Sequence, residues 1–338
     1  MRPFSYTRPA DLEQVWREHG PDTMYIAGGT NLVDLMKCGV ARPAHLVDIG
    51  ALPLDRVEAD AGTLRVGALV PNSDLAAHPE ARRIPMLAQA LLSGASPQLR
   101  NLATLGGNLM QRTRCGYLRD TAMPCNKRVP GSGCAAMDGA HHGHAVLGTS
   151  EHCIAVHPSD LAVALAALDA RVSVAGPNGA REVQADAFHL LPGDTPERET
   201  VLGPGELITG VAIPLEPVGA YSHYVKVRER ASFAFAMASA AVGLDVRDGG
   251  IRDARIALGG VATVPWRARA AERTLIGAAP DAAAFARAAD AATEGARPRR
   301  DNADKVGLIR GAVLRALHAL TAQPPPPPTA TPRDGAPA

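Results

Sequence analysis

Four of the five cysteines lie close together in the sequence and are the residues best placed to do chemistry. Cys115, Cys125, Cys134 and Cys153 follow the pattern C-x9-C-x8-C-x18-C, whereas Cys38 stands alone and is expected to be an ordinary thiol. Prolines and glycines interrupt the stretch, so we expect little regular secondary structure between Cys115 and Cys153. Something other than backbone pairing must therefore order it.

Three kinds of chemistry compete for these thiols: disulfides, a zinc site and an iron–sulfur cluster. Disulfides need an oxidising compartment, and structural zinc normally takes cysteines two to four residues apart. That spacing is absent, although four histidines could add ligands: His141, His142, His144 and His152. An iron–sulfur cluster needs only four thiolates that converge in space. Four nearby cations would partly offset the thiolate charge: Arg112, Arg114, Lys127 and Arg128. The pattern favours a cluster and leaves zinc and plain thiols open.

A second chemical pattern occurs twice in the sequence: a pair of glycines beside a hydroxyl and an amide side chain. The first lies in the run 27–31, between a short apolar strand and a helix, where backbone N–H groups can face a phosphate. The second lies in the run from Thr104 to Asn108. Two such loops could hold the two ends of one pyrophosphate. Taken alone, however, a Gly-Gly run is usually only a turn.

The elements expected around these motifs change in character near residue 220. Before it, the pattern predicts helices at about 12–16, 32–36, 72–93 and 161–168, and strands at about 24–27, 45–49, 63–69 and 170–175. After it, strands are expected at 225–227, 233–246 and 251–261, with a hairpin at 248–250. Helices at about 266–276, 281–294 and 303–320 would cover one face of that sheet.

The charge balance and hydropathy pattern exclude several classes of partner. Lys plus Arg number 35 against 34 Asp plus Glu, which gives no electrostatic reason to expect nucleic acid or an anionic membrane. No apolar run approaches the roughly 20 residues of a membrane span, so we expect no direct membrane insertion. The first residues also lack the apolar region of an export signal.

Four motifs occur in an order that is typical of one protein family. They are AGGTNL at 27–32, QLRNLATLGGN at 98–108, HPSDL at 157–161 and YVKVRERASFAFA at 224–236. The chain up to about residue 322 resembles the FAD-binding (medium) subunits of molybdenum hydroxylases, the family of xanthine dehydrogenase and carbon monoxide dehydrogenase. The cysteine stretch looks most like the insertion in the flavin subunit of bacterial periplasmic aldehyde oxidoreductases, which carries a [4Fe–4S] cluster. A related insertion occurs in the flavin subunit of 4-hydroxybenzoyl-CoA reductase.

The resemblance implies an α+β fold in four parts. A two-part FAD-binding domain of the PCMH (vanillyl-alcohol-oxidase-like) type would comprise an α/β part at 1–55 and a second part at 56–218, with the iron–sulfur insertion at 109–156. An α+β C-terminal domain with an antiparallel sheet and helices would follow at 219–322. The Pro-rich residues 323–338 would form a disordered tail.

The resemblance also implies cofactors and the residues that bind them. FAD would be bound by the first loop, the second loop and two charged residues: Tyr25, Ile26, Ala27, Gly28, Gly29, Thr30, Asn31, Leu32, Thr104, Gly107, Asn108, Asp160 and Lys226. Asp160 could instead only favour a helix N-terminus, and Lys226 could be an exposed strand lysine. The metal ligands of a [4Fe–4S] cluster would be Cys115, Cys125, Cys134 and Cys153, and no catalytic acid or base is expected.

The implied function is electron transfer within a larger oxidoreductase. A large molybdenum-cofactor subunit and a small [2Fe–2S] subunit would be the partners, in a heterotrimer or its multiple, and electrons from aldehyde oxidation would leave through FAD to an external acceptor. Alternatives are the flavin subunit of an aromatic acyl-CoA reductase-like or N-heterocycle-oxidising enzyme, and a zinc-stapled non-catalytic scaffold. With no signal of its own, the chain would be periplasmic by co-export with a partner, or cytoplasmic.

Overall fold

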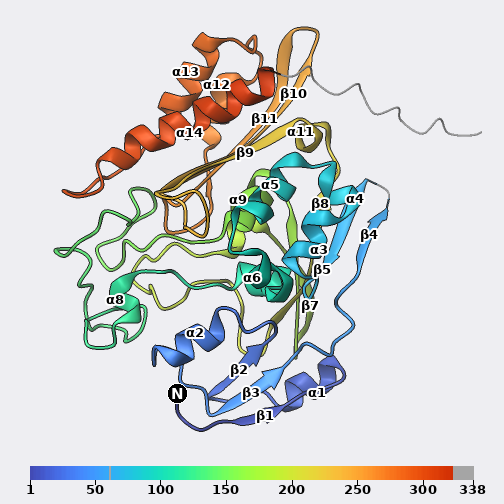
Figure 1. Cartoon of the computed structure of the whole chain (residues 1–338), viewed down its shortest axis with the longest axis vertical. Coiled ribbons are helices and arrows are strands. Elements are labelled where there is room, and N and C mark those ends of the chain that lie inside the picture. Colours follow the sequence, from blue (N-terminus) through green and yellow to red (C-terminus); the bar gives the residue numbers. More distant parts are fainter. Residues whose placement is uncertain (61, 323–338) are drawn as a thin grey trace, which may run out of the picture.

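Three β-sheets with helices packed on them make up the chain (Figure 1). The computed structural model describes residues 1–60 and 62–322. The tail expected at 323–338 lies outside these residues. Within the described part, no helix is both long and apolar enough to cross a membrane.

The N-terminal unit is a parallel three-stranded sheet in the order β1-β3-β2. Asp11 begins its first helix by accepting a hydrogen bond from the Gln14 N–H at 2.8 Å, a typical N-cap. Val15 of that helix and Val47 share a small apolar core. The elements are β1 (Ser5–Thr7), α1 (Leu12–Arg17), β2 (Thr23–Ile26), α2 (Leu32–Lys37) and β3 (His45–Asp48).

The middle unit is a five-stranded antiparallel sheet in the order β4-β5-β8-β6-β7. Its core is shared with α5 and α9, which come from opposite sides of the cysteine segment in the sequence. The central strand, β8, was not among the expected elements. The strands are β4 (Val57–Asp60), β5 (Thr63–Gly67), β6 (Arg171–Gly176), β7 (Gly179–Gln184) and β8 (Leu207–Pro214), with α9 (Asp160–Ala167) and α10 (Ala185–Phe188) beside them.

The helical stretch expected over 72–93 is divided into three helices by two prolines. Pro79 and Pro85 each occupy the first turn of a helix, where the missing N–H costs nothing. The residue before a proline avoids the helical conformation, as His78 does with φ −64° and ψ 132°. The helices are α3 (Asn72–Ala77), α4 (Pro79–Arg82) and α5 (Pro85–Ser93), followed by α6 (Pro97–Leu102) and α7 (Leu105–Leu109).

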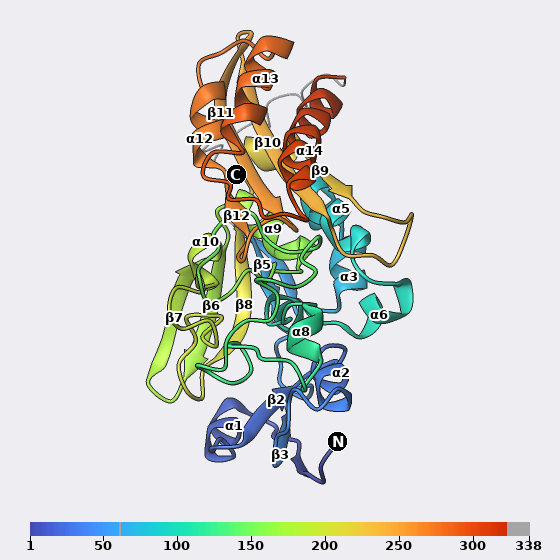
Figure 2. The ribbon, with the colours of Figure 1, turned by 90° about the vertical axis from the view of Figure 1, so that its left-hand side faces the viewer.

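The C-terminal unit is a four-stranded antiparallel sheet, and Figure 2 shows the helices that lie on one of its faces. Residues of both faces are buried. Ala241 of β10 belongs to the core shared with α5 and α9, while its neighbours Ala240 and Val242 pack in the core shared with α12, α13 and α14. The three C-terminal helices thus cover one face, as expected. The elements are α11 (Pro217–Ala220), β9 (Ser222–Val227), β10 (Ala238–Arg247), β11 (Gly250–Gly259), β12 (Trp266–Arg267), α12 (Arg269–Leu275), α13 (Ala282–Ala291) and α14 (Asp304–Thr321).

The sequence predicted the cysteine segment correctly as irregular, but it placed the start of β10 too early. The strand expected from Phe233 begins only at Ala238, because Phe233 has a left-handed backbone with φ +51° that no strand can contain. The cysteine segment is irregular, as expected. Its regular features are the short helix α8 (Gly116–Arg119) and two isolated bridges, an antiparallel one between Cys125 and Cys134 and a parallel one between Leu147 and Ala262.

Candidate cofactor site

The first glycine loop, between β2 and α2, presents unpaired backbone N–H groups to a cavity. Within the described part of the chain, the N–H groups of Gly28, Gly29, Thr30 and Asn31 donate no hydrogen bond. All four residues line a cavity of about 480 Å³. Consecutive unpaired N–H groups at a helix N-terminus form an anion-binding concavity. The loop therefore fits a phosphate group.

Gly28 is required for a reason that the sequence did not reveal. A Cβ at this position would lie 1.7 Å from the carbonyl oxygen of Leu102 in α6, the helix that leads into the second glycine loop. The first loop is thus in direct backbone contact with the end of the helix that leads into the second loop. Gly29 serves the turn itself, with φ +69°.

The second loop differs from the first because its own N–H groups are already used. The Thr104 hydroxyl caps α7 by accepting a hydrogen bond from the Gly107 N–H at 3.2 Å, and the Gly106 N–H donates to the Ala68 carbonyl at 2.8 Å. Thr104 and Gly107 line the first cavity. This loop can therefore contribute surface and side chains, whereas the free N–H groups come from the first loop.

A second and larger cavity of about 1040 Å³ adjoins the first. Asn108, Asp160 and Lys226 line this cavity and do not line the smaller one. Six of the described residues line both cavities: Thr30, Asn31, Gly107, Gln111, Thr113 and Val156. The two adjacent cavities have volumes in the range that bound cofactors occupy.

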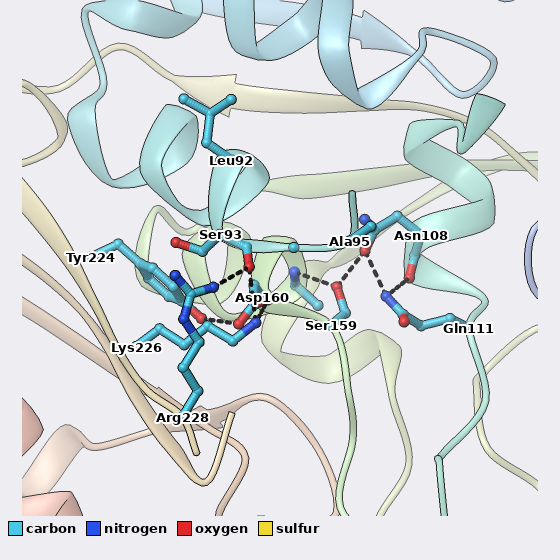
Figure 3. A network of polar contacts seen from close by, with 12 residues as sticks. Leu92, Ser93, Ala95, Asn108, Gln111, Ser159, Asp160, Tyr224, Lys226 and Arg228 are labelled. Carbon is cyan, nitrogen blue, oxygen red and sulfur yellow. Dashed lines mark hydrogen bonds and ion pairs between the residues drawn. The ribbon is translucent and has the colours of Figure 1, made fainter. Parts of the chain in front are cut away.

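Asn31 and Asn108 each point an amide into this site. The Asn31 side-chain oxygen accepts the Arg112 N–H at 3.1 Å, while its side-chain nitrogen is buried and has no partner. The Asn108 oxygen accepts from the Ser159 hydroxyl at 2.6 Å and from Gln111 at 2.9 Å (Figure 3). Both amide oxygens are thus engaged by the chain, which leaves the nitrogens as donors for a ligand.

Asp160 and Lys226 form a buried ion pair at the wall of the larger cavity (Figure 3). The Lys226 ammonium lies 2.7 Å from the Asp160 carboxylate and donates to the Ser93 carbonyl at 3.0 Å. The Tyr224 hydroxyl donates to the same carboxylate at 2.6 Å, and burial raises the Tyr224 pKa well above 10. Lys226 is therefore not an exposed strand lysine, and Asp160 does more than begin α9.

Removing the Asp160 carboxylate is expected to destabilise the chain strongly. Asp160→Ala leaves the Lys226 ammonium buried without a counter-charge, which typically costs about 3–5 kcal/mol. Urea unfolding of the purified chain measures the loss. The double variant Asp160→Ala/Lys226→Met should recover most of it, because no charge then remains buried. A loss below about 1 kcal/mol in the single variant would contradict this account.

Two histidines whose rings are in contact line the first cavity and escaped the sequence analysis. The rings of His157 and His189 lie 4.1 Å apart between centroids, and one nitrogen of each, Nε2 of His157 and Nδ1 of His189, is buried without a partner. Burial lowers the pKa of His189 to about 4 and that of His157 well below its usual value of 6.5. Both rings are therefore neutral at pH 7. His157 stands in the quoted HPSDL motif, but no local signal marks His189.

The four clustered cysteines surround one small pocket, and none is in a disulfide. Burial raises the pKa of three of the thiols, and that of Cys153 reaches about 11. Backbone N–H groups point at their sulfurs: those of Tyr117 and Leu118 at Cys115, those of Ala136, Met137 and Ile154 at Cys134, and that of Ala155 at Cys153. Cys38 lies apart, with its sulfur 3.2 Å from the Arg119 guanidinium.

Four thiols around one pocket are the kind of donor set that an iron–sulfur cluster takes. In the described residues no group of three or more His, Cys, Asp and Glu is placed to hold one metal ion. Zinc–sulfur bonds of about 2.3 Å would require the sulfurs to converge closely, whereas a cluster separates its thiolates by the width of its own core. N–H groups directed at the sulfurs are a feature that tunes iron–sulfur sites.

The basic residues near the cysteines have partners of their own. Arg112 and Lys127 both bind the partly buried Glu199, at 3.0 and 3.1 Å, and Arg128 donates to backbone carbonyls. These cations therefore offset the charge of the thiolates less than we expected from the sequence, because other groups of the chain already bind them. Lys127 still lies close enough to lower the Cys153 pKa against the larger effect of burial.

Asp34 ties the cysteine segment to the first glycine loop. This residue of α2 accepts hydrogen bonds from Arg114 and Arg119 on either side of Cys115, each at 2.7 Å. The Arg119 guanidinium, followed by Arg114, holds the pKa of the Asp34 carboxyl below its usual 3.8. The helix that begins at the anion-binding loop is thus anchored to the thiol pocket.

The Asp34 contact is expected to be lost in acid. A carboxyl whose pKa is lowered by folding stabilises the fold above its ordinary pKa of 3.8 and loses that effect as the pH falls through the folded value. Asp34→Asn should therefore melt at a lower temperature than the unaltered chain at pH 7, and the difference should shrink below about pH 4. Thermal melts across pH 3–8 check this, and a difference independent of pH would contradict it.

Known sequence families match nearly the whole described chain. The FAD binding domain in molybdopterin dehydrogenase matches residues 2–216, and the CO dehydrogenase flavoprotein C-terminal domain matches residues 223–317. The chain belongs to the FAD-binding subunits of the molybdenum hydroxylase family. The resemblance drawn from the four motifs is thereby confirmed, as are the fold class and the assignment to the oxidoreductases.

Individual relatives extend this molybdenum hydroxylase assignment. The chain is 52% identical over 281 residues to the aldehyde oxidoreductase FAD-binding subunit PaoB of Escherichia coli K12, covering 81% of this chain and 86% of that protein. It is 29% identical to the carbon monoxide dehydrogenase medium chain of Hydrogenophaga pseudoflava, over 95% and 98% of the two chains. Its fold matches quinoline 2-oxidoreductase from Pseudomonas putida 86, with a TM-score of 0.74 and 28% identity over 95% and 98%.

The family membership tests the fold and the class of protein, but it does not test individual residues. The domain boundaries, the FAD-binding residues and the four cluster ligands therefore stay predictions. The structure brings the first-loop residues 25–32 together with Thr104 and Gly107 in one cavity, and Asn108, Asp160 and Lys226 in the adjoining one.

Proposed function

We propose that this chain is the FAD- and [4Fe–4S]-containing electron-transfer subunit of a molybdenum-dependent aldehyde oxidoreductase. The observation that carries the proposal is the position of the four-thiol pocket directly beside the cofactor cavity, with Cys115 lining both. The 52% identity to an aldehyde oxidoreductase FAD-binding subunit supports the substrate class. Electrons from a partner's molybdenum cofactor and [2Fe–2S] centres would leave through this subunit to an external acceptor.

FAD would occupy the two adjoining cavities. The free N–H groups of residues 28–31 would bind the pyrophosphate, and the amide nitrogens of Asn31 and Asn108 would donate to the polar parts of the cofactor. The ion pair of Lys226 and Asp160 would form a fixed wall of the larger cavity. When bound, FAD would collect electrons delivered singly and release them in pairs.

The [4Fe–4S] cluster would be held by Cys115, Cys125, Cys134 and Cys153. Four thiols that line one pocket, with backbone N–H groups directed at three of the sulfurs, support this assignment. When bound, the cluster would supply a one-electron redox centre.

The assembly and its location are part of the same proposal. The partners would be a large molybdenum-cofactor subunit and a small [2Fe–2S] subunit, in a heterotrimer or its multiple. The complex would reach the periplasm by co-export with an exported partner, or would remain in the cytoplasm.

Anaerobic reduction of the assembled complex by substrate tests this function. Mixing with an aromatic aldehyde should bleach the visible flavin absorption within the turnover time, whereas an N-heterocycle such as quinoline should bleach it far more slowly. Rapid bleaching by the heterocycle alone would contradict the aldehyde assignment and favour the N-heterocycle-oxidising alternative. No bleaching by either would contradict the electron-transfer role.

A further inference from the structure

Cys115 occupies a special position among the four clustered cysteines. It lines the thiol pocket with the other three, and of the four it alone also lines the larger cofactor cavity. The Cys115 sulfur therefore marks the edge of the thiol pocket that faces the cofactor. A hydrogen bond to this sulfur would therefore influence the side of the thiol pocket that is nearest to the cofactor cavity.

His144 makes such a contact. Its Nε2 lies 3.2 Å from the Cys115 sulfur, while its Nδ1 is buried and has no partner. A thiolate can only accept a hydrogen bond, so the neutral imidazole must carry its proton on Nε2 to bind it. The ring is buried and also lines the larger cavity.

The C-terminal unit fixes the backbone around His144. Asn302 donates to the carbonyl of His144 at 3.4 Å, and Lys305 donates to the carbonyl of Gly143 at 3.1 Å. Both Asn302 and Lys305 are completely buried, although they are polar. Burying these groups is unfavourable unless they are hydrogen-bonded, and the carbonyls beside His144 are among their partners. The position of the imidazole is thus built into the packing of two units of the fold.

We propose that His144 is a positioning residue that donates a hydrogen bond from Nε2 to the Cys115 sulfur and thereby raises the reduction potential of the cluster at its cofactor-facing edge. The inference rests on the cluster proposed above. Reduction adds negative charge to the thiolate sulfurs, so a donor on one of them stabilises the reduced state more than the oxidised state. A donor to this sulfur favours electron uptake by the site beside the cofactor.

An anaerobic redox titration of the assembled complex, followed by electron paramagnetic resonance and by iron analysis, tests the proposal. His144→Leu removes the donor and should shift the midpoint potential of the cluster to more negative values with iron content unchanged. His144→Gln offers an amide N–H at a similar reach and should restore most of the shift. The control is His142→Leu, which alters a histidine of the same segment that is more than half exposed and touches no sulfur, and which should leave the potential unchanged.

The outcomes separate this inference from the function on which it rests. An unchanged potential in iron-replete His144→Leu would overturn the inference alone. Equal loss of iron from His144→Leu and His144→Gln would also overturn it, because His144 would then only pack against the thiol pocket. An unaltered complex that holds no iron beyond the [2Fe–2S] iron of its partner would overturn the proposed cluster and this inference together.

Discussion

Replacing Cys153 by serine is expected to remove nearly all iron from the chain. Cys153 is almost fully buried in the thiol pocket, and backbone N–H of Ala155 points at its sulfur. Serine keeps the size of the side chain but replaces the soft thiolate ligand that iron–sulfur clusters require. Iron should fall from roughly four atoms per chain to well below one, while the flavin loops remain intact. Metal analysis of the purified variant measures this.

The matched control for Cys153→Ser is Cys38→Ser. Cys38 is the cysteine of the chain that does not line the thiol pocket, and its sulfur contacts the Arg119 guanidinium. Its replacement should leave the iron content unchanged. Full iron in Cys153→Ser, or loss of iron in Cys38→Ser alone, would contradict the assignment of the four cluster ligands.

Gly28→Ala is expected to weaken FAD binding by about 5- to 150-fold. The added Cβ would lie 1.7 Å from the Leu102 carbonyl oxygen, so the two glycine loops would have to separate. Inserting a methyl group into such a contact costs about 1–3 kcal/mol. The shift would move the free N–H groups of residues 28–31 away from their positions around the cavity. Titration of the deflavinated chain with FAD measures the affinity.

Gly311→Ala is the control for a glycine that has no close neighbour. Gly311 is exposed in α14, and a Cβ there would meet nothing within 4 Å. Because the added methyl group meets no neighbour, this variant should bind FAD normally. Alanine in a helix interior is about 1 kcal/mol more favourable than glycine, so the variant should also unfold at a slightly higher denaturant concentration. Normal FAD affinity in Gly28→Ala would contradict the view that contact between the two loops shapes the site.

Much of the fold could be predicted because local signals agreed with the final packing. The helical spacing at 12–16 and the hairpin turn at 248–250 are short-range signals, and both features are found in the structure. The central strand β8 was missed, since a buried strand of continuous apolar residues lacks the alternation that identifies an edge strand. The helix break at His78 was also missed, because helical periodicity was followed although the residue before a proline prefers an extended backbone.

The candidate site was only partly predictable, because its geometry depends on contacts between distant residues. The sequence indicated the first glycine loop, but the contact of Gly28 with Leu102 exists only once α6 packs on that loop. The pairing of Asp160 with Lys226 joins α9 to β9 across 66 residues of chain. The second loop looked equivalent to the first, yet the N–H groups of residues 105–108 already donate to other groups of the chain.

The combined flavin and metal content of the purified, assembled complex tests the central claim most directly. The account predicts one FAD and roughly four iron atoms on this chain beyond those of its partners, with no zinc. Absorption spectroscopy, cofactor release and metal analysis of the unaltered complex and of Cys153→Ser give these numbers, and the difference in iron between the two assigns the cluster to this subunit. FAD with zinc in place of iron, or equal iron in both complexes, would contradict the account.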